Sequence, residues 1–328
     1  MRYREIGATG LKVSVVGFGA WGIGGKVKDG LSYGRTDDAV SRRALAAAFD
    51  HGITLYDTAP LYGLGHSEAL IGQAFTGHRD RIVIATKVGY SDFNRRADFS
   101  PAAIRQSVED SLQRLRTDYI DILQLHDASP EYLRQHPETL STLDDLRREG
   151  KLRLVGASVK LPADGVPIIQ DHGLKVIQAN LSMMDRRSFE GGLLDAAMTG
   201  GAGIIARTPL HFGFLTGQLT GNEEFGPDDH RSRWSRQHLV RWANDAQHLL
   251  TAAGWQPGKS ATPFALRFAL SCPGVATTIP GILSPEQAVE NAACGELDDF
   301  PASVMAAIAD SYNDESTPNH DVAGKRAS

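Results

Sequence analysis

Short apolar runs rich in Val and Ile alternate with longer amphipathic stretches along almost the whole of this 328-residue chain. Such alternation is typical of a parallel sheet whose strands are connected by crossover helices. The runs are apolar on both faces, as strands buried on both sides must be. The strand candidates are Val13–Phe18, Thr54–Tyr56, Ile82–Thr86, Tyr119–Leu125, Leu152–Ala157, Lys175–Ala179, Gly203–Ala206 and Ala276–Ile279. These runs predict an α/β fold with a single (β/α)8 TIM barrel rather than two domains.

Helix start signals lie between the strand candidates. Ser100 is suited to cap a helix that has Pro101 at its first position. A second helix is expected to begin near Asp37, with its alanines facing inward. Residues 284–287, Ser-Pro-Glu-Gln, have the pattern of a capping box with proline at the first helical position.

Three segments depart from the regular alternation. The connection between the seventh and eighth strands, residues 207–275, is too long for one helix and predicts a long insertion: a loop over the barrel mouth near 221–229, then two helices. Residues 3–7 and 11–13 flank a glycine-containing turn and predict an N-terminal β-hairpin that plugs the barrel bottom. We expect the barrel to span residues 1–312 and the polar C-terminal tail, 313–328, to be loosely ordered.

Charge and composition exclude several classes of partner. The formal net charge of -5 and the sequence pI near 6.1 give no broad positive field, so we expect neither nucleic acid nor a membrane surface as a partner. No apolar run reaches the length of about 20 residues that spans a bilayer, and the first residues lack the apolar stretch of a secretory signal. We therefore expect a cytoplasmic protein. The sequence does not predict its oligomeric state. Cys272 and Cys294 are too few for a disulfide framework or a thiolate metal site, and buried thiols are expected.

Polar groups follow three consecutive strand candidates. Asp57 and Tyr62 follow the second strand, Lys87 follows the third, and His126 follows the fourth. Because the reactive groups of such barrels lie at the C-terminal ends of the strands, we expect these four side chains to meet on one rim.

The four groups suit carbonyl reduction. The reaction needs a proton at oxygen while hydride arrives at carbon, and a free phenol with a pKa of about 10 is a reluctant donor at neutral pH. A neighbouring ammonium lowers the pKa of a phenol, so Lys87 is expected to activate Tyr62 as the general acid and base, with Asp57 holding Lys87. His126 is expected to orient the carbonyl oxygen. No metal is expected, since a cofactor would carry the hydride.

In these positions the sequence resembles the aldo-keto reductase family, over residues 3–300. The family's Asp, Tyr, Lys and His tetrad falls on Asp57, Tyr62, Lys87 and His126, in the contexts Asp-Thr-Ala, Tyr-Gly, Thr-Lys and Leu-His. The segments 17–21, Gly-Phe-Gly-Ala-Trp, and 65–68, Gly-His-Ser-Glu, also match. The resemblance implies the barrel fold and a hydride transfer between a nicotinamide cofactor, NADP(H) or NAD(H), and a small-molecule carbonyl or alcohol.

The resemblance also assigns binding residues. Ser158 and Gln178 resemble the pair that holds the nicotinamide carboxamide, residues 208–213 match the loop around the pyrophosphate, and Glu290 with Asn291 match adenine contacts. The expected cofactor-binding residues are Gly19, Ala20, Trp21, Asp57, Ser158, Gln178, Arg207, Thr208, Leu210, Gly213, Ile279, Gly281, Gln287, Glu290 and Asn291. The expected substrate-binding residues are Trp21, Tyr62, Tyr90 and His126. The alternative is that these residues have only structural roles. Ser158 and Gln178 could form hydrogen bonds with backbone amides at strand ends, and Glu290 and Asn291 could lie on an exposed helix face.

Departures from the family pattern are informative. Val159 stands where many members have an asparagine that grips the carboxamide, and Arg207 stands where an aromatic ring often stacks on the nicotinamide. Members selective for NADPH often carry Lys, Ser and Arg near residues 279–287, whereas Gly281, Ile282 and Gln287 supply no positive charge for a 2′-phosphate. A relaxed preference, or one for NAD(H), is expected.

The substrate and two other functions stay open at this stage. Trp21, Tyr90, Phe93, Phe225 and Trp234 lie on predicted mouth loops and could form an aromatic wall or simply pack. Residues 58–63 and the short span after Lys87 resemble bacterial branches acting on sugars, lactols and other polar carbonyls, so a sugar-like or secondary-metabolite ketone, aldehyde or lactol is expected. The alternatives are a cofactor-binding redox sensor or channel-subunit-like module with little turnover, and a barrel isomerase or aldolase that uses a Schiff-base lysine.

Overall fold

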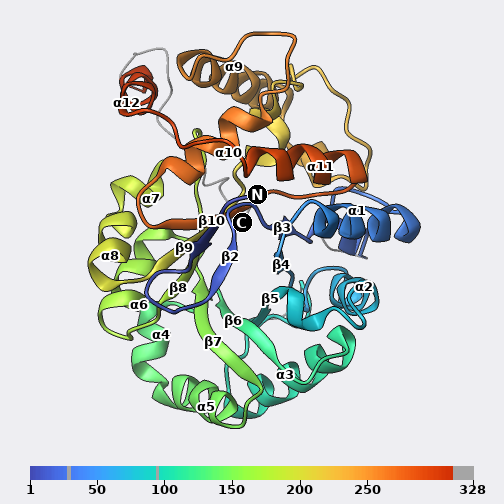
Figure 1. Cartoon of the computed structure of the whole chain (residues 1–328), viewed down its shortest axis with the longest axis vertical. Coiled ribbons are helices and arrows are strands. Elements are labelled where there is room, and N and C mark those ends of the chain that lie inside the picture. Colours follow the sequence, from blue (N-terminus) through green and yellow to red (C-terminus); the bar gives the residue numbers. More distant parts are fainter. Residues whose placement is uncertain (28–30, 94–95, 313–328) are drawn as a thin grey trace.

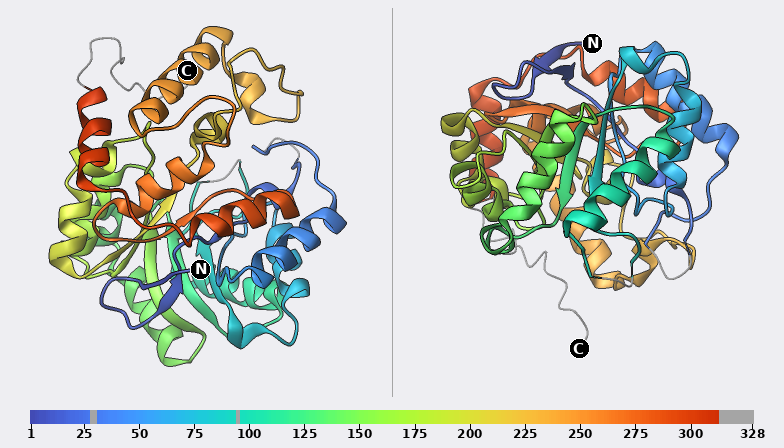
Figure 2. Two further views of the ribbon diagram at one scale, coloured as in Figure 1. Left: turned by 45° about the horizontal axis from the view of Figure 1, so that its top comes forward. Right: turned by 90° about the horizontal axis from the view of Figure 1, so that it is seen from below.

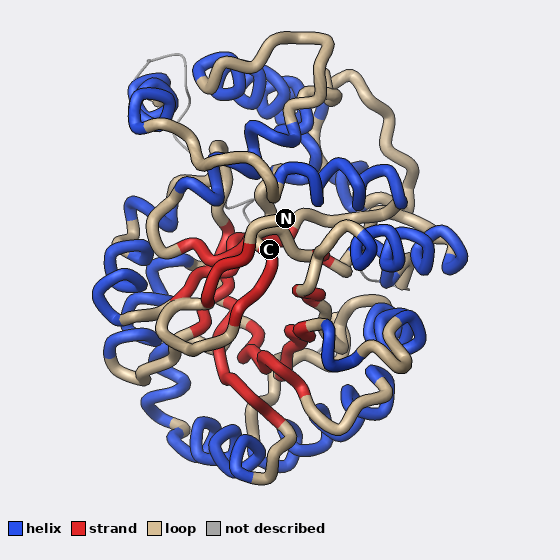
Figure 3. The backbone as a smooth tube through the Cα atoms, in the orientation of Figure 1, coloured by secondary structure: helices blue, strands red, loops and turns tan. Residues whose placement is uncertain are grey.

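A ring of eight parallel strands forms the centre of the molecule in the computed structural model, which describes residues 1–27, 31–93 and 96–312 (Figures 1 and 3). The strands are hydrogen-bonded in the order β3 to β10, and the helices lie outside them. Parallel bridges between Val16 and Thr278, and between Gly19 and Gly281, join the first strand to the last. The predicted (β/α)8 barrel is therefore confirmed.

The barrel strands are β3 (Phe18–Gly19), β4 (Leu55–Asp57), β5 (Val83–Val88), β6 (Ile120–His126), β7 (Leu152–Ser158), β8 (Val176–Asn180), β9 (Gly203–Arg207) and β10 (Val275–Ile279). The helices are α1 (Asp38–Asp50), α2 (His66–Ala74), α3 (Pro101–Leu115), α4 (Pro130–Gln135), α5 (Pro137–Arg148), α6 (Gly165–Gln170), α7 (Arg187–Glu190), α8 (Leu193–Gly200), α9 (Arg236–Ala252), α10 (Thr262–Ser271), α11 (Pro285–Cys294) and α12 (Ala302–Ser311). Short 3-10 helices are η1 (Gly22–Gly24), η2 (Arg79–Arg81), η3 (Pro162–Asp164), η4 (His211–Thr216) and η5 (His230–Arg233).

The N-terminal hairpin covers one end of the barrel, as predicted. Strands β1 (Tyr3–Glu5) and β2 (Lys12–Ser14) pair antiparallel, and Figure 1 shows the hairpin in dark blue across the ring of strands. Ile6, Leu11 and Val13 join one buried apolar cluster with inward-facing residues of the barrel strands. The predicted first strand, Val13–Phe18, is partly wrong, because Val13 pairs with Arg4 in the hairpin and the barrel strand is only Phe18–Gly19.

The predicted helix starts are those of α1, α3 and α11. The Asp37 side chain accepts the N–H groups of the first turn of α1, and Ser100 does the same for α3. Ser284 caps α11, but the reciprocal half of the predicted capping box differs. The Gln287 side chain accepts the N–H of Leu283 at 2.8 Å instead of that of the capping serine.

The insertion between β9 and β10 contains η4, a loop, η5 and the helices α9 and α10, as the sequence predicts. These helices lie with α12 on one side of the ring, which the left view of Figure 2 shows from another direction. Within the described ranges, no helix combines the length and apolar character needed to cross a membrane. The predicted tail, residues 313–328, lies outside the described residues.

Candidate active site

The four predicted catalytic residues meet at the C-terminal ends of neighbouring strands. Asp57 ends β4, Lys87 lies near the end of β5, and His126 ends β6. Tyr62 lies in the turn after β4, before α2 begins at His66. Because β4, β5 and β6 are adjacent in the barrel, residues far apart in the sequence share this rim.

Lys87 is the centre of the group. Its Nζ donates to Asp57 Oδ1 at 2.7 Å, to the backbone oxygen of Thr58 at 2.9 Å and to the Tyr62 hydroxyl at 3.1 Å. Three acceptors match the three N–H bonds of an ammonium. Lys87 is completely shielded from solvent and Asp57 is 2% exposed, so the pair acts where water screens charge least.

The second oxygen of Asp57 extends the network to other strands. Asp57 Oδ2 accepts from Gln178 Nε2 at 2.6 Å and from Gln124 Nε2 at 3.1 Å. Gln124 Oε1 in turn accepts from Gln178 Nε2 at 3.1 Å. Sequence reasoning missed Gln124, although a buried amide two residues before His126 in an apolar strand faces the same side as that histidine.

Burial and charge set the protonation of two of these residues. Burial alone would lower the pKa of Lys87, but Asp57 and Tyr62 outweigh burial and raise that pKa, so the side chain is an ammonium. Burial, together with the charges of Lys87 and Arg207, holds the pKa of His126 well below its usual range. His126 is therefore a neutral imidazole with one N–H donor and one acceptor nitrogen.

Of the predicted substrate-binding aromatic residues, Tyr90 lies beside the group. Its ring packs edge-on against His126 with the centroids 5.3 Å apart. Trp21 instead packs on Tyr33 at 4.9 Å and on His230 at 5.1 Å, where the insertion meets the loop after β3. Sequence reasoning missed His230, since nothing local to η5 indicates that it docks on the opposite side of the mouth.

Of the other three predicted wall residues, Phe93 lies in a turn after β5, and Trp234 and Phe225 pack within the insertion. Trp234 contacts Phe212 and Trp242, and the Phe225 ring lies under the Arg231 guanidinium. Nothing in these contacts assigns either side chain to a substrate.

The predicted nicotinamide residues lie next to the tetrad. Ser158 ends β7 and Gln178 lies in β8, and the Ser158 hydroxyl is 3.5 Å from Gln178 Oε1. Arg207 ends β9 and donates from Nη2 to the backbone oxygen of Val159 at 2.9 Å. The guanidinium thus contacts Val159, the position at which many members of the family have an asparagine, and its Nη1 lies 3.5 Å from Ser158 Oγ.

The remaining cofactor set falls on two segments. Thr208, Leu210 and Gly213 lie in the loop and in η4 after β9, where Thr208 and Gly213 have left-handed φ values of 57° and 98°. Ile279 ends β10, Gly281 follows it, and Gln287, Glu290 and Asn291 belong to α11. Asn291 is buried at 2% exposure, whereas Gln287 is exposed.

Gly19 and Ala20 have structural tasks of their own. A Cβ on Gly19 would lie 2.8 Å from the backbone oxygens of Ile279 and Pro280, so barrel closure itself requires glycine there. The carbonyl of Ala20 accepts the Ser67 hydroxyl at 2.8 Å, and Ser67 accepts from Thr58 at 2.9 Å. This chain of hydroxyls anchors the turn that carries Tyr62.

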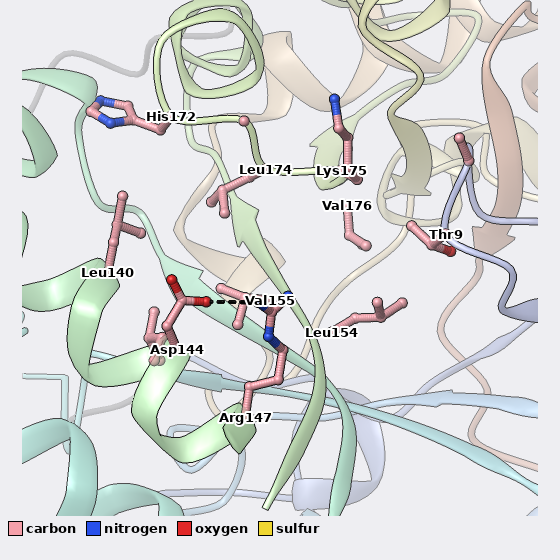
Figure 4. A pocket seen from close by; sticks show the side chains of 13 residues that line it. Thr9, Leu140, Asp144, Arg147, Leu154, Val155, His172, Leu174, Lys175 and Val176 are labelled. Carbon is pink, nitrogen blue, oxygen red and sulfur yellow. Dashed lines mark ion pairs between the residues drawn. The ribbon is translucent and has the colours of Figure 1, made fainter. Parts of the chain in front are cut away.

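The hollow drawn in Figure 4 lies away from these residues. It has a volume of about 340 Å³ and is lined by the hairpin turn, α5 and the start of β8, including Thr9, Asp144 and Val176. None of the tetrad lines it. Because reactive groups of such barrels lie at the opposite, C-terminal ends of the strands, we place the candidate active site at Tyr62 and Lys87.

Comparison with known proteins gives a consistent result. The model of the Aldo/keto reductase family matches residues 15–313. The NADH-specific methylglyoxal reductase of Escherichia coli is 32% identical over 334 residues, covering 94% of this chain and 99% of that protein. The L-galactose dehydrogenase of Arabidopsis thaliana is 33% identical, covering 88% and 86%. The solved structure of the glycerol dehydrogenase AKR11B4 from Gluconobacter oxydans is similar with a TM-score of 0.81 and 28% identity, covering 98% of both chains.

Proposed function

This chain belongs to the aldo/keto reductase family, and on that basis we propose that it transfers a hydride between a nicotinamide cofactor and a hydroxylated, sugar-like carbonyl or alcohol, with Tyr62 as general acid and base. It is an NAD(P)H-dependent oxidoreductase acting on small-molecule carbonyl compounds, as its reductase and dehydrogenase relatives are named. The observation that carries the proposal is the 3.1 Å contact between the Tyr62 hydroxyl and the buried Lys87 ammonium.

In the reductive direction Tyr62 donates its proton to the carbonyl oxygen. The Lys87 ammonium then stabilises the negative charge left on the phenol oxygen, and Asp57 holds the ammonium in place. Neutral His126 donates its N–H to the same carbonyl oxygen and so fixes the orientation of the substrate. In the oxidative direction the phenolate takes the proton of the alcohol. A bound nicotinamide dinucleotide supplies or accepts the hydride.

The residues present fit such a cofactor. Ser158, Gln178 and Arg207 offer polar atoms at adjacent strand ends, and Arg207 Nε is shielded from solvent without a hydrogen-bond partner among the described residues. Gln178 Nε2 is committed to Asp57, which leaves Oε1 to accept from the carboxamide. At the other end Gly281 has open space where a side chain would lie. We assign the pyrophosphate to the 208–213 loop and the adenosine to Gln287 and Glu290.

We further propose a preference for NAD(H). Glu286, in the first turn of α11, is an exposed carboxylate whose pKa is lowered by hydrogen bonding to Ser284, so it would repel a 2′-phosphate. The name of the NADH-specific relative agrees with this preference. Fluorescence titration should give tighter binding of NADH than of NADPH, and Glu286→Gln should reduce this difference in affinity. NADPH binding more than about tenfold tighter than NADH would overturn the preference.

The test of the function is a panel of sugars, short hydroxyaldehydes and aromatic aldehydes with both cofactors. We expect turnover of the hydroxylated carbonyls and its loss, by about 100-fold or more, in Tyr62→Phe, which keeps the ring and removes the proton donor. Turnover of flat aromatic aldehydes alone would contradict the substrate class.

The geometry disfavours the two alternative functions. An intact proton donor beside a buried ammonium favours catalysis over sensing. Steady-state turnover separates the two functions, since a sensor would bind cofactor with almost no multiple turnover. A Schiff-base mechanism needs a neutral amine, whereas the pKa of Lys87 is raised by Asp57 against the opposing effect of burial.

A further inference from the structure

Asp127, the residue directly after His126, has an unusual backbone. Its φ is +62°, in the left-handed region that side chains other than glycine adopt at a cost. The Asp127 N–H donates to the backbone oxygen of Ser158 at 2.8 Å, so the conformation is held by the neighbouring strand. Strained residues held in this way cluster at functional sites.

The Asp127 carboxyl group is also incompletely satisfied. Its Oδ1 is shielded from solvent and has no hydrogen-bond partner within the described residues. A shielded carboxylate oxygen without a donor is rare in folded proteins, because desolvation is not offset. The side chain is half-buried as a whole, and its second oxygen, Oδ2, is not shielded in this way, so Oδ2 is the oxygen open to a ligand.

The surroundings place this carboxyl group at the site. Burial raises its pKa, while the positive charges of Arg207, Lys160 and Lys87 act in the opposite direction. Lys87 belongs to the tetrad, and Arg207 lies against Ser158 and Val159. The guanidinium donates to those two residues and not to the carboxyl group, so an acceptor remains available beside His126.

We infer that Asp127 is a specificity-determining residue that accepts a hydrogen bond from a substrate hydroxyl group close to the reacting carbonyl. The inference rests on the proposed function and deepens it, since it selects α-hydroxy carbonyls and their vicinal diols over deoxy analogues. A site that holds an acceptor for a substrate hydroxyl discriminates strongly against the analogue without it, because the acceptor then stays desolvated and unpaired. The negative charge also disfavours substrates that carry phosphate at this end.

The test compares glyceraldehyde with propanal, which has the same carbon chain and no hydroxyl group. We expect kcat/KM to favour glyceraldehyde in the wild-type protein, and Asp127→Ala to reduce the ratio by about tenfold or more while changing kcat/KM for propanal by less than about threefold. Asp127→Asn tolerates the left-handed backbone and keeps an acceptor oxygen, so its glyceraldehyde-to-propanal ratio of kcat/KM should lie between those of the wild type and Asp127→Ala. Asp164→Asn is the matched control, because it removes a nearby carboxylate that acts on Asp127 but is not next to His126.

A binding readout separates this inference from the proposed function. Saturation-transfer NMR on the NAD-loaded protein should detect glycerol more strongly than 1-propanol, and Asp127→Ala should abolish the difference even if no substrate in the panel turns over. Equal losses of kcat/KM for glyceraldehyde and propanal in Asp127→Ala would overturn the inference. They would indicate instead that Asp127 supports the position of His126. An unchanged ratio in both the kinetic and the NMR comparison would overturn it outright. Loss of propanal turnover in Tyr62→Phe tests only the proposed function.

Discussion

Replacing the buried Asp57 should destabilise the protein as well as inactivate it. Asp57 accepts from Lys87 at 2.7 Å and from two amide groups, of Gln178 and Gln124, at 2.6 and 3.1 Å. In Asp57→Asn one side-chain oxygen remains for the ammonium, but the new NH2 group faces two amide donors. Lys87 then stays buried without its counter-charge, and breaking a buried pair in this way costs about 3–5 kcal/mol. Lys87→Met should cost about as much, since it leaves the carboxylate buried.

The double variant gives the sharper test. Asp57→Asn combined with Lys87→Met removes both charges, so its cost should fall about 2–3 kcal/mol short of the sum of the single variants. The assay is urea unfolding at pH 7.5, followed by far-UV circular dichroism and tryptophan fluorescence. Glu131→Gln is the control, because its pair with Arg134 is exposed and should contribute less than about 1 kcal/mol. Single variants that cost below about 1 kcal/mol, or strictly additive costs, would refute the reasoning.

Three further variants test other parts of the site. Gly63→Ala places a Cβ 2.3 Å from the Gly24 oxygen at a φ of 65°, so it should displace Tyr62, the proposed general acid and base, and lower kcat about tenfold or more. Gly77→Ala, with a φ of 83° and open space around the new Cβ, should leave kcat unchanged. The neutral His126 contributes stability that is present above about pH 6.5 and is lost as the pH falls toward its lowered pKa in the folded protein. His126→Gln should therefore reduce the pH dependence of the free energy of unfolding between about pH 7 and 5. The same pH dependence in the variant and the wild type would contradict this. Gln124→Leu leaves one N–H of the Gln178 amide unpaired in the interior and removes one of the two amide donors to Asp57 Oδ2, so it should cost about 1–3 kcal/mol, measured by the same urea titration.

Local patterns were enough to predict the strands, the capped helices and the four catalytic candidates. The apolar runs identify buried strands because a strand covered on both faces excludes polar residues, and barrel topology then places whatever follows each strand on one rim. The same patterns failed at Val13, because an apolar β-branched residue suits a hairpin strand as well as a barrel strand. Pairing with Arg4 decided between them.

The sequence alone determined that an ammonium, a phenol, a carboxylate and an imidazole would share the mouth of one barrel. Only the tertiary structure decided the long-range contacts: Gln178 donates to Asp57, 121 positions away in the sequence, and the His230 ring donates from Nδ1 to the backbone oxygen of Ser32, 198 positions away. It also decided that Asp127 holds a strained backbone with an unpaired oxygen. Strand and helix signals depend on neighbours a few residues apart, whereas hydrogen-bond partners and burial depend on which distant segments the closed barrel brings together.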